Sequence, residues 1–137
     1  MRDPNDRNTR IIEEFRANQG QVEMFKGIPL LLLHHTGAKS GRNYVNPLAY
    51  FRDGSRMVVF ASKGGADSNP DWYHNLVTHP DIKVELGDGT LTDAKAVILQ
   101  GEERDRIYDR QVERVPVFGE YRQKTGRTIP VIALEPA

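Results

Sequence analysis

The apolar residues near the start of the chain recur with the period of a helix. Ile11, Ile12 and Phe15 fall on one face of a helix over residues 9–18, and the charged residues between them fall elsewhere. Gly20 follows as a stop signal. The pattern predicts an amphipathic helix within an N-terminal segment over residues 1–27. Packing of its apolar face on the rest of the protein is favoured over contact with a membrane surface.

Beyond this segment the pattern changes to short apolar runs separated by turn residues, which is typical of strands. Asp53-Gly54 and Asp88-Gly89 each stand between two such runs and therefore predict hairpin turns. The expected strands cover residues 29–36, 44–52, 57–62, 82–86, 91–99 and 128–134.

Two helices are expected between and after these strands. Asn69-Pro70 begins one, because asparagine caps helices and proline suits the first turn, and this helix ends before Pro80. The second covers residues 102–115, and residues 118–124 form a short turn. Hairpins joined by a few helices predict a mainly β (α+β) protein, with an antiparallel barrel, closed or partly closed, over residues 28–137.

Length, charge and hydropathy narrow the classes of protein to which this chain can belong. A chain of 137 residues is the size of one domain, and its 19 basic and 19 acidic residues give a formal net charge of zero. A nucleic-acid-binding protein normally has a basic excess, so nucleic acid is not an expected partner. The longest apolar run, residues 28–33, is too short to span a membrane, and the polar first residues do not resemble a signal peptide. We expect a soluble, cytoplasmic protein.

Residue types exclude several kinds of site. The chain has no cysteine, which excludes disulfides, thiolate metal sites and thiol nucleophiles. His34 and His35 are adjacent on a predicted strand and point to opposite faces, while His74 and His79 have a poor spacing for chelation. No zinc-protease or nucleophile-elbow pattern occurs. We therefore expect no metal, and a redox role would need a bound organic cofactor.

Three segments could hold an anionic ligand. Residues 37–42 combine glycines with Lys39, Ser40 and Arg42, which suits phosphate or carboxylate groups, and a solvated turn is the alternative. Residues 61–65 leave a strand with Lys63 beside two glycines, or form a flexible connection. Residues 69–76 begin a helix whose N-terminus favours anions, although Trp72 is equally suited to a core position.

These segments, in this order, resemble the deazaflavin-dependent nitroreductase family of actinobacteria, whose members use coenzyme F420. The resemblance covers nearly the whole chain from Ile28, and its specificity lies in the order and spacing of the strings. The strings are Thr36-Gly-Ala-Lys-Ser-Gly41, Val45-Asn-Pro-Leu48, Ala61-Ser-Lys-Gly-Gly65, Asn69-Pro-Asp-Trp-Tyr73 with Asn75-Leu76, and Thr125-Gly-Arg-Thr-Ile-Pro130. The resemblance implies a split β-barrel of the FMN-binding type, with the coenzyme ring between barrel and helix.

The resemblance also implies which residues contact the coenzyme. Its phosphate and glutamate tail would meet Lys39, Ser40 and Arg42, and its ring would lie near the strand that follows. The other side of the site would come from the second glycine loop and from the helix. The complete set is Lys39, Ser40, Arg42, Tyr44, Val45, Asn46, Pro47, Leu48, Ala49, Phe60, Ala61, Ser62, Lys63, Asp71, Trp72, Tyr73, His74 and Asn75.

Two departures from the family pattern concern the substrate. Many relatives have an arginine at the position of Tyr44. Nitroimidazole-activating members have three tyrosines where this chain has Val115, Phe118 and Tyr121. Because valine and phenylalanine cannot hydrogen-bond an acceptor or relay a proton, nitroimidazole activation is not carried over to this chain. Tyr121 is the expected polar contact to the acceptor, with Phe118 and Val115 as apolar walls.

We therefore expect a coenzyme F420-dependent reductase that passes hydride from the reduced deazaflavin to a quinone-like, nitroaromatic or other conjugated acceptor. One alternative is an FMN-dependent split-barrel reductase or oxidase. Another is a deazaflavin-binding carrier without turnover. Peripheral contact with the inner face of the cell membrane is compatible with a quinone acceptor, and the sequence leaves the oligomeric state open.

Overall fold

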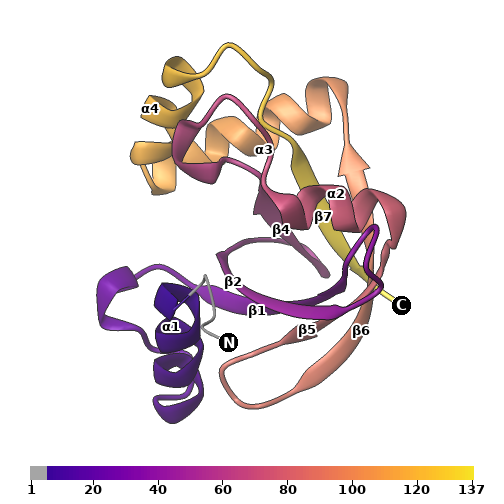
Figure 1. Cartoon of the computed structure of the whole chain (residues 1–137). Coiled ribbons are helices and arrows are strands. Elements are labelled where there is room, and N and C mark those ends of the chain that lie inside the picture. The colour runs from indigo at the N-terminus through magenta and orange to yellow at the C-terminus, as the bar shows by residue number, and fades with distance from the viewer. Residues whose placement is uncertain (1–5) are drawn as a thin grey trace.

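A computed structural model describes residues 7–63 and 65–137 of the chain in full, and of Asp6 and Gly64 only their place in a helix. The described strands form one antiparallel sheet in the order β2-β1-β5-β6-β7-β4-β3 (Figure 1). Expectations for residues 1–5 and for Gly64 lie outside the described residues. The strands are β1 (Leu30–Thr36), β2 (Asn43–Ala49), β3 (Phe51–Asp53), β4 (Arg56–Phe60), β5 (Asp81–Glu85), β6 (Leu91–Leu99) and β7 (Val131–Pro136).

The two edges of this sheet are joined by a single residue. β2 lies at one edge and β3 at the other, yet only Tyr50 separates Ala49 from Phe51 along the chain. With one residue between them, the Cα atoms of Ala49 and Phe51 can be at most about 7 Å apart, which is little more than the separation of neighbouring strands, so the sheet must curl until its edges approach each other. The curled sheet confirms the predicted antiparallel split barrel.

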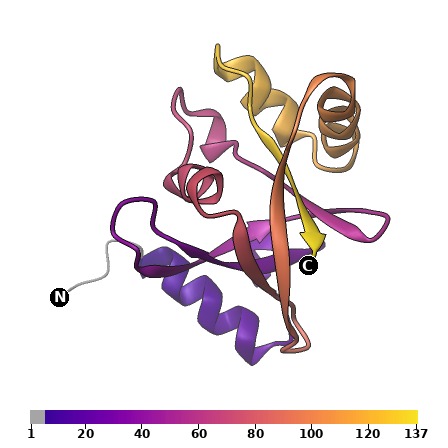
Figure 2. The same cartoon turned by 90° about the vertical axis from the view of Figure 1, so that its right-hand side faces the viewer.

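Two hydrophobic clusters occupy the two faces of the strand pair β4 and β7. Val59 and Ile132 belong to a cluster with Leu31 and Leu33 that Trp72 of α2 (Asp71–Thr78) covers. The alternate residues, among them Val58, Phe60 and Ala133, join a second cluster against α3 (Gly101–Arg114) and α4 (Val117–Lys124). The alternation follows from the two-residue period of a strand, and it places α2 on one side of this strand pair and α3 with α4 on the other (Figure 2).

The N-terminal helix α1 (Asp6–Ala17) covers the opposite side of the sheet (Figure 2). Ile11 and Phe15 are buried against Leu30 and Leu32 of β1, and a short 3-10 helix, η1 (Glu23–Phe25), follows. This confirms the predicted helix and the packing of its apolar face on the protein. None of the described helices is long and apolar enough to cross a membrane.

A polar clamp fixes α1 to the sheet beside this cluster. Arg16 donates two hydrogen bonds of 2.9 Å to the Glu85 carboxylate on β5, and His34 Nε2 lies 2.8 Å from Glu85 Oε1. The hydrogen bonds from Arg16 and then from His34 outweigh burial and hold the pKa of Glu85 below its ordinary value of 4.5. The neighbouring His35 points to the other face, as predicted.

The structure corrects the start of α2. Asn69 was expected to cap this helix with Pro70 in its first turn, but Pro70 is the N-cap residue and no side chain caps the helix. The Asn69 side chain instead accepts a hydrogen bond of 2.7 Å from Arg127. A charge-assisted bond to a guanidinium is stronger than a bond to a backbone amide, so the distant partner takes precedence.

Element boundaries bring two further corrections. The expected turn over residues 118–124 is the helix α4, which begins directly after Pro116, and α3 ends at Arg114. The expected strand over residues 44–52 divides at Tyr50 into β2 and β3, because the chain there crosses from one sheet edge to the other. The hairpin at Asp53-Gly54 is confirmed.

Replacing Glu85 by glutamine should lower the free energy of unfolding by about 1 kcal/mol at pH 7, since the clamp is partly solvent-exposed. The pKa of Glu85 is lowered by folding. The clamp's contribution is therefore complete above pH 4.5 and is lost as the pH falls through the folded value. Chemical denaturation at pH 7, 5 and 3.5 measures the difference between wild type and variant, which should be largest at pH 7 and should shrink as the pH is lowered below 4.5.

Glu113→Gln is the matched control, because Glu113 is an exposed carboxylate on α3 with no ion pair among residues 7–63 and 65–137. It should leave the stability within about 0.5 kcal/mol of wild type. Equal losses in both variants, or a loss in Glu85→Gln that does not decrease between pH 7 and pH 3.5, would contradict the clamp.

Candidate functional site

The loop over residues 37–42 is a tight turn with two exposed cations. Gly37 N–H donates to Arg42 O at 2.8 Å, and Gly41 N–H donates to Gly37 O at 3.1 Å. A Cβ atom at Gly37 would meet Ser40 Oγ and would lie 2.9 Å from the Tyr44 ring, so only glycine permits this packing. Lys39 and Arg42 are exposed and form no ion pair with a described residue. The turn thus presents two free positive charges.

A buried hydrogen-bonded chain ties this loop to α2. Ala38 N–H donates to Asn75 Oδ1 at 2.8 Å, Asn75 Nδ2 lies 3.1 Å from His35 Nδ1, and His35 Nε2 lies 2.7 Å from Asn46 Oδ1. Burial lowers the pKa of His35, against a smaller opposing effect of the Asn46 hydrogen bond. Tyr44 stacks on the His35 ring with centroids 5.8 Å apart. Strand, loop and helix are therefore held in one arrangement.

The predicted coenzyme-binding residues of β2 divide between the two faces of the sheet. Asn46 contacts His35, and Leu48 packs on the cluster beneath α2, whereas Val45 and Ala49 pack on the α1 cluster. Pro47 lies between Asn46 and Leu48 along the strand, and so faces the α1 side as well. The side chains of Asn46 and Leu48 are thus near the other expected contacts, and those of Val45, Pro47 and Ala49 are not.

The loop over residues 61–69 carries Lys63 in an unusual conformation. Lys63 has φ +48°, in the left-handed region that non-glycine residues rarely adopt, within the short helix η2 (Lys63–Gly65). Its Nζ donates to Ser68 Oγ at 3.3 Å and has no carboxylate partner among the described residues. Ser62 is buried at the start of this turn. Backbone strain at a predicted contact supports a functional role for the loop.

Hydrogen bonds from the Arg127 side chain fix the loop over residues 61–69. The guanidinium donates to the carbonyl oxygens of Ala61, Ser62 and Ala66 at 3.2, 2.9 and 2.9 Å, and to Asn69 Oδ1 at 2.7 Å. These four oxygens lie along nine residues of chain, so one side chain fixes the path of the whole loop. All of them are acceptors, and none of them is a carboxylate.

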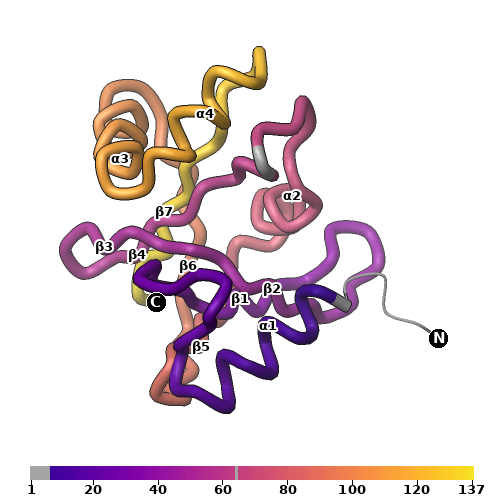
Figure 3. Tube along the Cα trace, turned by 90° about the vertical axis from the view of Figure 1, so that its left-hand side faces the viewer, coloured from indigo at the N-terminus to yellow at the C-terminus, as the bar shows by residue number. Residues whose placement is uncertain are grey.

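Helix α2 lies between these two loops (Figure 3). Trp72 is buried in the core together with Ala61, and Tyr73 packs at the edge of the same cluster. Asp71 and His74 are exposed, whereas Asn75 is buried in the hydrogen-bonded chain described above. The structure therefore brings the three predicted coenzyme segments together around one helix, with Trp72 in a core position.

The predicted acceptor residues lie on and beside α4. Phe118 is 9% exposed and packs edge-on against Phe60 and Tyr121, with ring centroids 5.5 and 5.3 Å apart. Tyr121 and Val115 are half-buried at the margin of this cluster. The buried Tyr108 of α3 donates its hydroxyl to Phe118 O at 2.7 Å, which anchors α4, and burial raises the pKa of Tyr108.

The loop over residues 61–69 and α4 touch at one glycine. Gly65 has φ +83°, and a Cβ atom there would lie 3.1 Å from both Tyr121 Cα and Lys124 Cδ. Thr125, directly after α4, donates to Asp67 of the loop at 3.3 Å. The loop that carries Lys63 is thus packed against the helix that carries Tyr121, which couples the expected coenzyme and acceptor contacts.

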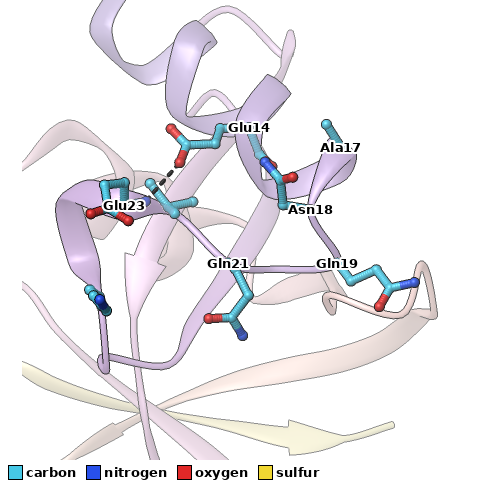
Figure 4. Close-up of a pocket in the computed structure, with 8 residues that line it drawn as sticks. Glu14, Ala17, Asn18, Gln19, Gln21 and Glu23 are labelled. Atoms are coloured by element: carbon cyan, nitrogen blue, oxygen red, sulfur yellow. Dashed lines mark hydrogen bonds between the residues drawn. The ribbon is translucent and has the colours of Figure 1, made fainter.

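A surface hollow of about 620 Å³ lies elsewhere, between the end of α1 and η1 (Figure 4). Glu14, Asn18, Gln21 and Glu23 are among its lining residues, and Glu23 N–H donates to Glu14 Oε2 at 2.7 Å. None of the predicted site residues lines it. The acidic lining does not suit an anionic coenzyme, so the hollow is not a candidate for this ligand.

The charges around α2 fit the tail of coenzyme F420, which has a phosphodiester and several carboxylates. Lys39, Arg42 and Lys63 are exposed cations on the two flanking loops, and no carboxylate among the described residues neutralises them. Residues 7–63 and 65–137 contain no cluster of three histidine, aspartate or glutamate side chains that could hold a metal ion. The residues present therefore fit an organic polyanion.

Comparison with known proteins also indicates an F420-dependent protein. The model of a family described as F420H(2)-dependent quinone reductase matches residues 7–136. This chain belongs to that family. A Mycobacterium tuberculosis protein, named as a candidate F420H(2)-dependent quinone reductase, is 40% identical over 111 residues, which are 81% of this chain and 92% of that protein. The match confirms the resemblance drawn from the sequence strings.

Solved structures agree with the family match. A structure described as an F420-H2 dependent reductase is 39% identical, with a TM-score of 0.71 over 78% of this chain and 94% of the other. A second, described as a domain-swapped dimer, is 36% identical with a TM-score of 0.72 and covers 97% of this chain and 100% of the other. Both confirm the split-barrel fold of the quinone reductase family for this chain.

Sequence reasoning missed three residues that shape the site. His35 was considered only as a metal ligand, Arg127 only as part of a family string, and Tyr108 not at all. Each acts through partners that are distant in sequence: Asn75, the loop over residues 61–69, and Phe118. Only the clustering of Arg127 with Thr125 in one string gave a signal beforehand.

Gly65→Ala tests the contact between the loop over residues 61–69 and α4. An alanine at φ +83° costs about 1 to 2 kcal/mol of unfolding free energy, and its methyl group must also displace Tyr121 or Lys124. We expect this reductase-family protein to lose both stability, measured by thermal unfolding, and affinity for its acceptor, measured as a several-fold higher KM.

Gly54→Ala is the matched control. Gly54 has φ +64°, but a Cβ atom there would meet nothing within 4 Å. This variant should show the same backbone cost without a change in KM. An unchanged KM in Gly65→Ala would show that the contact is structural only.

Proposed function

We infer that this protein is a coenzyme F420-dependent reductase that acts on a quinone-like acceptor. Membership of the F420H(2)-dependent quinone reductase family carries the inference. The three cations that lack carboxylate partners, on the loops beside α2, support it from the structure. The reduced coenzyme, when bound, supplies the hydride.

The chain's own residues bind and orient the two reactants. Lys39 and Arg42 on one loop and Lys63 on the other attract the anionic groups of the tail. The hydrogen-bonded chain from Ala38 to Asn46 and the Arg127 contacts keep both loops in place before the coenzyme arrives. Such preorganisation reduces the ordering cost of binding.

The acceptor side is formed by α4. The Tyr121 hydroxyl has no hydrogen-bond partner among the described residues, so it is available to a quinone oxygen, on which negative charge develops during reduction. Phe118 and Val115 supply apolar surface beside it and exclude water. A planar apolar acceptor with carbonyl oxygens suits this surface better than a charged one.

The two alternatives make different predictions for the purified protein. An FMN enzyme would copurify with, or prefer, a yellow flavin, and a carrier would bind F420 without oxidising it against any acceptor. The family match favours the deazaflavin over FMN. The Tyr121 hydroxyl on α4, which has no partner among the described residues, favours turnover over a carrier role.

Oxidation of reduced F420 should depend on an added soluble menaquinone analogue and should weaken sharply in Lys63→Gln. Removing this cation should raise the Kd of the coenzyme about 10-fold, since a charge-assisted contact contributes roughly 1.4 kcal/mol. Coenzyme fluorescence measures the binding, and absorbance measures the oxidation. Absence of binding at micromolar protein would refute the deazaflavin assignment, and binding without oxidation against a panel of quinones would favour a carrier.

Lys95→Gln is the matched control, because Lys95 is an exposed lysine on β6 at a position with no predicted contact to the coenzyme. Its Kd should stay within twofold of wild type. Equal weakening in both variants would show that only the overall charge matters.

Tyr121→Phe should lower kcat/KM for the quinone about 10-fold without changing the Kd of the coenzyme, because it removes one hydrogen bond to the acceptor. Stopped-flow oxidation at several quinone concentrations measures the effect. Wild-type kinetics in Tyr121→Phe would identify its hydroxyl as structural.

A further inference from the structure

In the hydrogen-bonded chain beside α2, which runs from Ala38 through Asn75 and His35 to Asn46, the order of donors and acceptors is fixed by the Ala38 N–H. The backbone N–H of Ala38 can only donate, so the Asn75 atom 2.8 Å away must be the oxygen. The Asn75 nitrogen must then face His35, at 3.1 Å from Nδ1. Asn75 is 9% exposed, so water cannot readily replace either partner.

The orientation of the Asn75 amide determines which nitrogen of the His35 ring carries the proton. Because Asn75 Nδ2 donates, His35 Nδ1 must accept and carries no proton, and the single proton of the neutral ring lies on Nε2. Nε2–H then donates to Asn46 Oδ1 at 2.7 Å. His35 is 5% exposed, and a second proton would bring two donors face to face at Asn75. Turning the Asn75 amide would only move that conflict to Ala38.

The orientation of the last amide follows. Asn46 Oδ1 is committed to His35, so its Nδ2 group points away from the imidazole and has no acceptor among the described residues. Asn46 is half-buried on the same side of β2 as Leu48, which packs beneath α2. Two N–H donors are therefore held ready on the side of the sheet where the three coenzyme segments meet.

We propose that His35 is a positioning residue that orients the Asn46 amide, so that Asn46 Nδ2 donates to a carbonyl oxygen of the deazaflavin ring. The inference rests on the proposed function, since it takes F420 as the ligand. A deazaflavin ring has pyrimidine carbonyl oxygens that need donors once they leave water, and an amide nitrogen of fixed orientation supplies one without an ordering cost.

The tautomer of His35 is the first test, and it needs no coenzyme. In ¹⁵N-labelled protein the two ring nitrogens of His35 should give separate signals typical of an unprotonated Nδ1 and a protonated Nε2, and they should keep them at pH 6. Signals of the opposite tautomer, or averaged signals of a ring in exchange with its charged form, would overturn the proposal.

Coenzyme affinity is the second test. Asn46→Asp keeps the oxygen that accepts from His35 but replaces the free donor by an acceptor, so the Kd of oxidised F420, followed by its fluorescence, should rise at least 10-fold. Asn43→Asp is the matched control, an exposed asparagine on the same strand with no hydrogen-bond partner for its side chain among the described residues, and it should change the Kd less than twofold. Equal Kd values in the two variants would overturn the donor role.

A pair of substitutions separates positioning from packing. His35→Phe keeps a ring beneath Tyr44 but removes both hydrogen bonds, and it should raise the Kd as Asn46→Asp does. His35→Gln can still donate to Asn46 and should recover most of the affinity. Equal loss in both would overturn the positioning role. If wild-type protein fails to bind F420, the proposed function itself fails, whereas loss of the effect in the variants alone refutes only this inference.

Discussion

The fold depends on one short connection, Tyr50, which joins the two opposite edges of the sheet. Because the edges must meet, the strands curl, and β1, β4 and β7 turn alternate side chains toward different helices. The curl explains why α2 covers the interior cluster while α3 and α4 cover the outer face of β4 and β7. It also brings loops from distant parts of the chain to the two sides of α2 (Figure 3).

The site is built from loops that are fixed by side chains rather than by their own sequence. Glycines permit the close turns, but His35 and Arg127 determine where the turns lie. His35 and Arg127 hydrogen-bond only to uncharged groups. No carboxylate is needed to fix the loops, and Lys39, Arg42 and Lys63 have no carboxylate partner among the described residues. Neutral internal contacts and free external charges are together what an anionic ligand requires.

Much of the architecture was predictable from the sequence because it follows from local rules. Short apolar runs bounded by turn residues identified the strands, and Asp53-Gly54 identified a hairpin. The missed features depend on distant partners. Asn69 was predicted to cap α2, but Arg127, 58 residues later, binds it instead. The helix over residues 117–124 was predicted as a turn, because its anchor, the Tyr108 hydroxyl, lies on another helix. The family strings indicated the coenzyme segments but not how their side chains divide between the faces of β2.

The Arg127 contacts have a consequence for how this loop can diversify. Three of its four acceptors are main-chain oxygens, at Ala61, Ser62 and Ala66, and every residue type supplies such an oxygen. Where the side chain is not packed in the core, as at the half-buried Ala66, it can therefore be exchanged during evolution without altering the path of the backbone. Because Arg127 fixes the backbone of the loop mainly through main-chain oxygens, substitutions of exposed side chains in the loop can change its ligand preference while the fold is conserved.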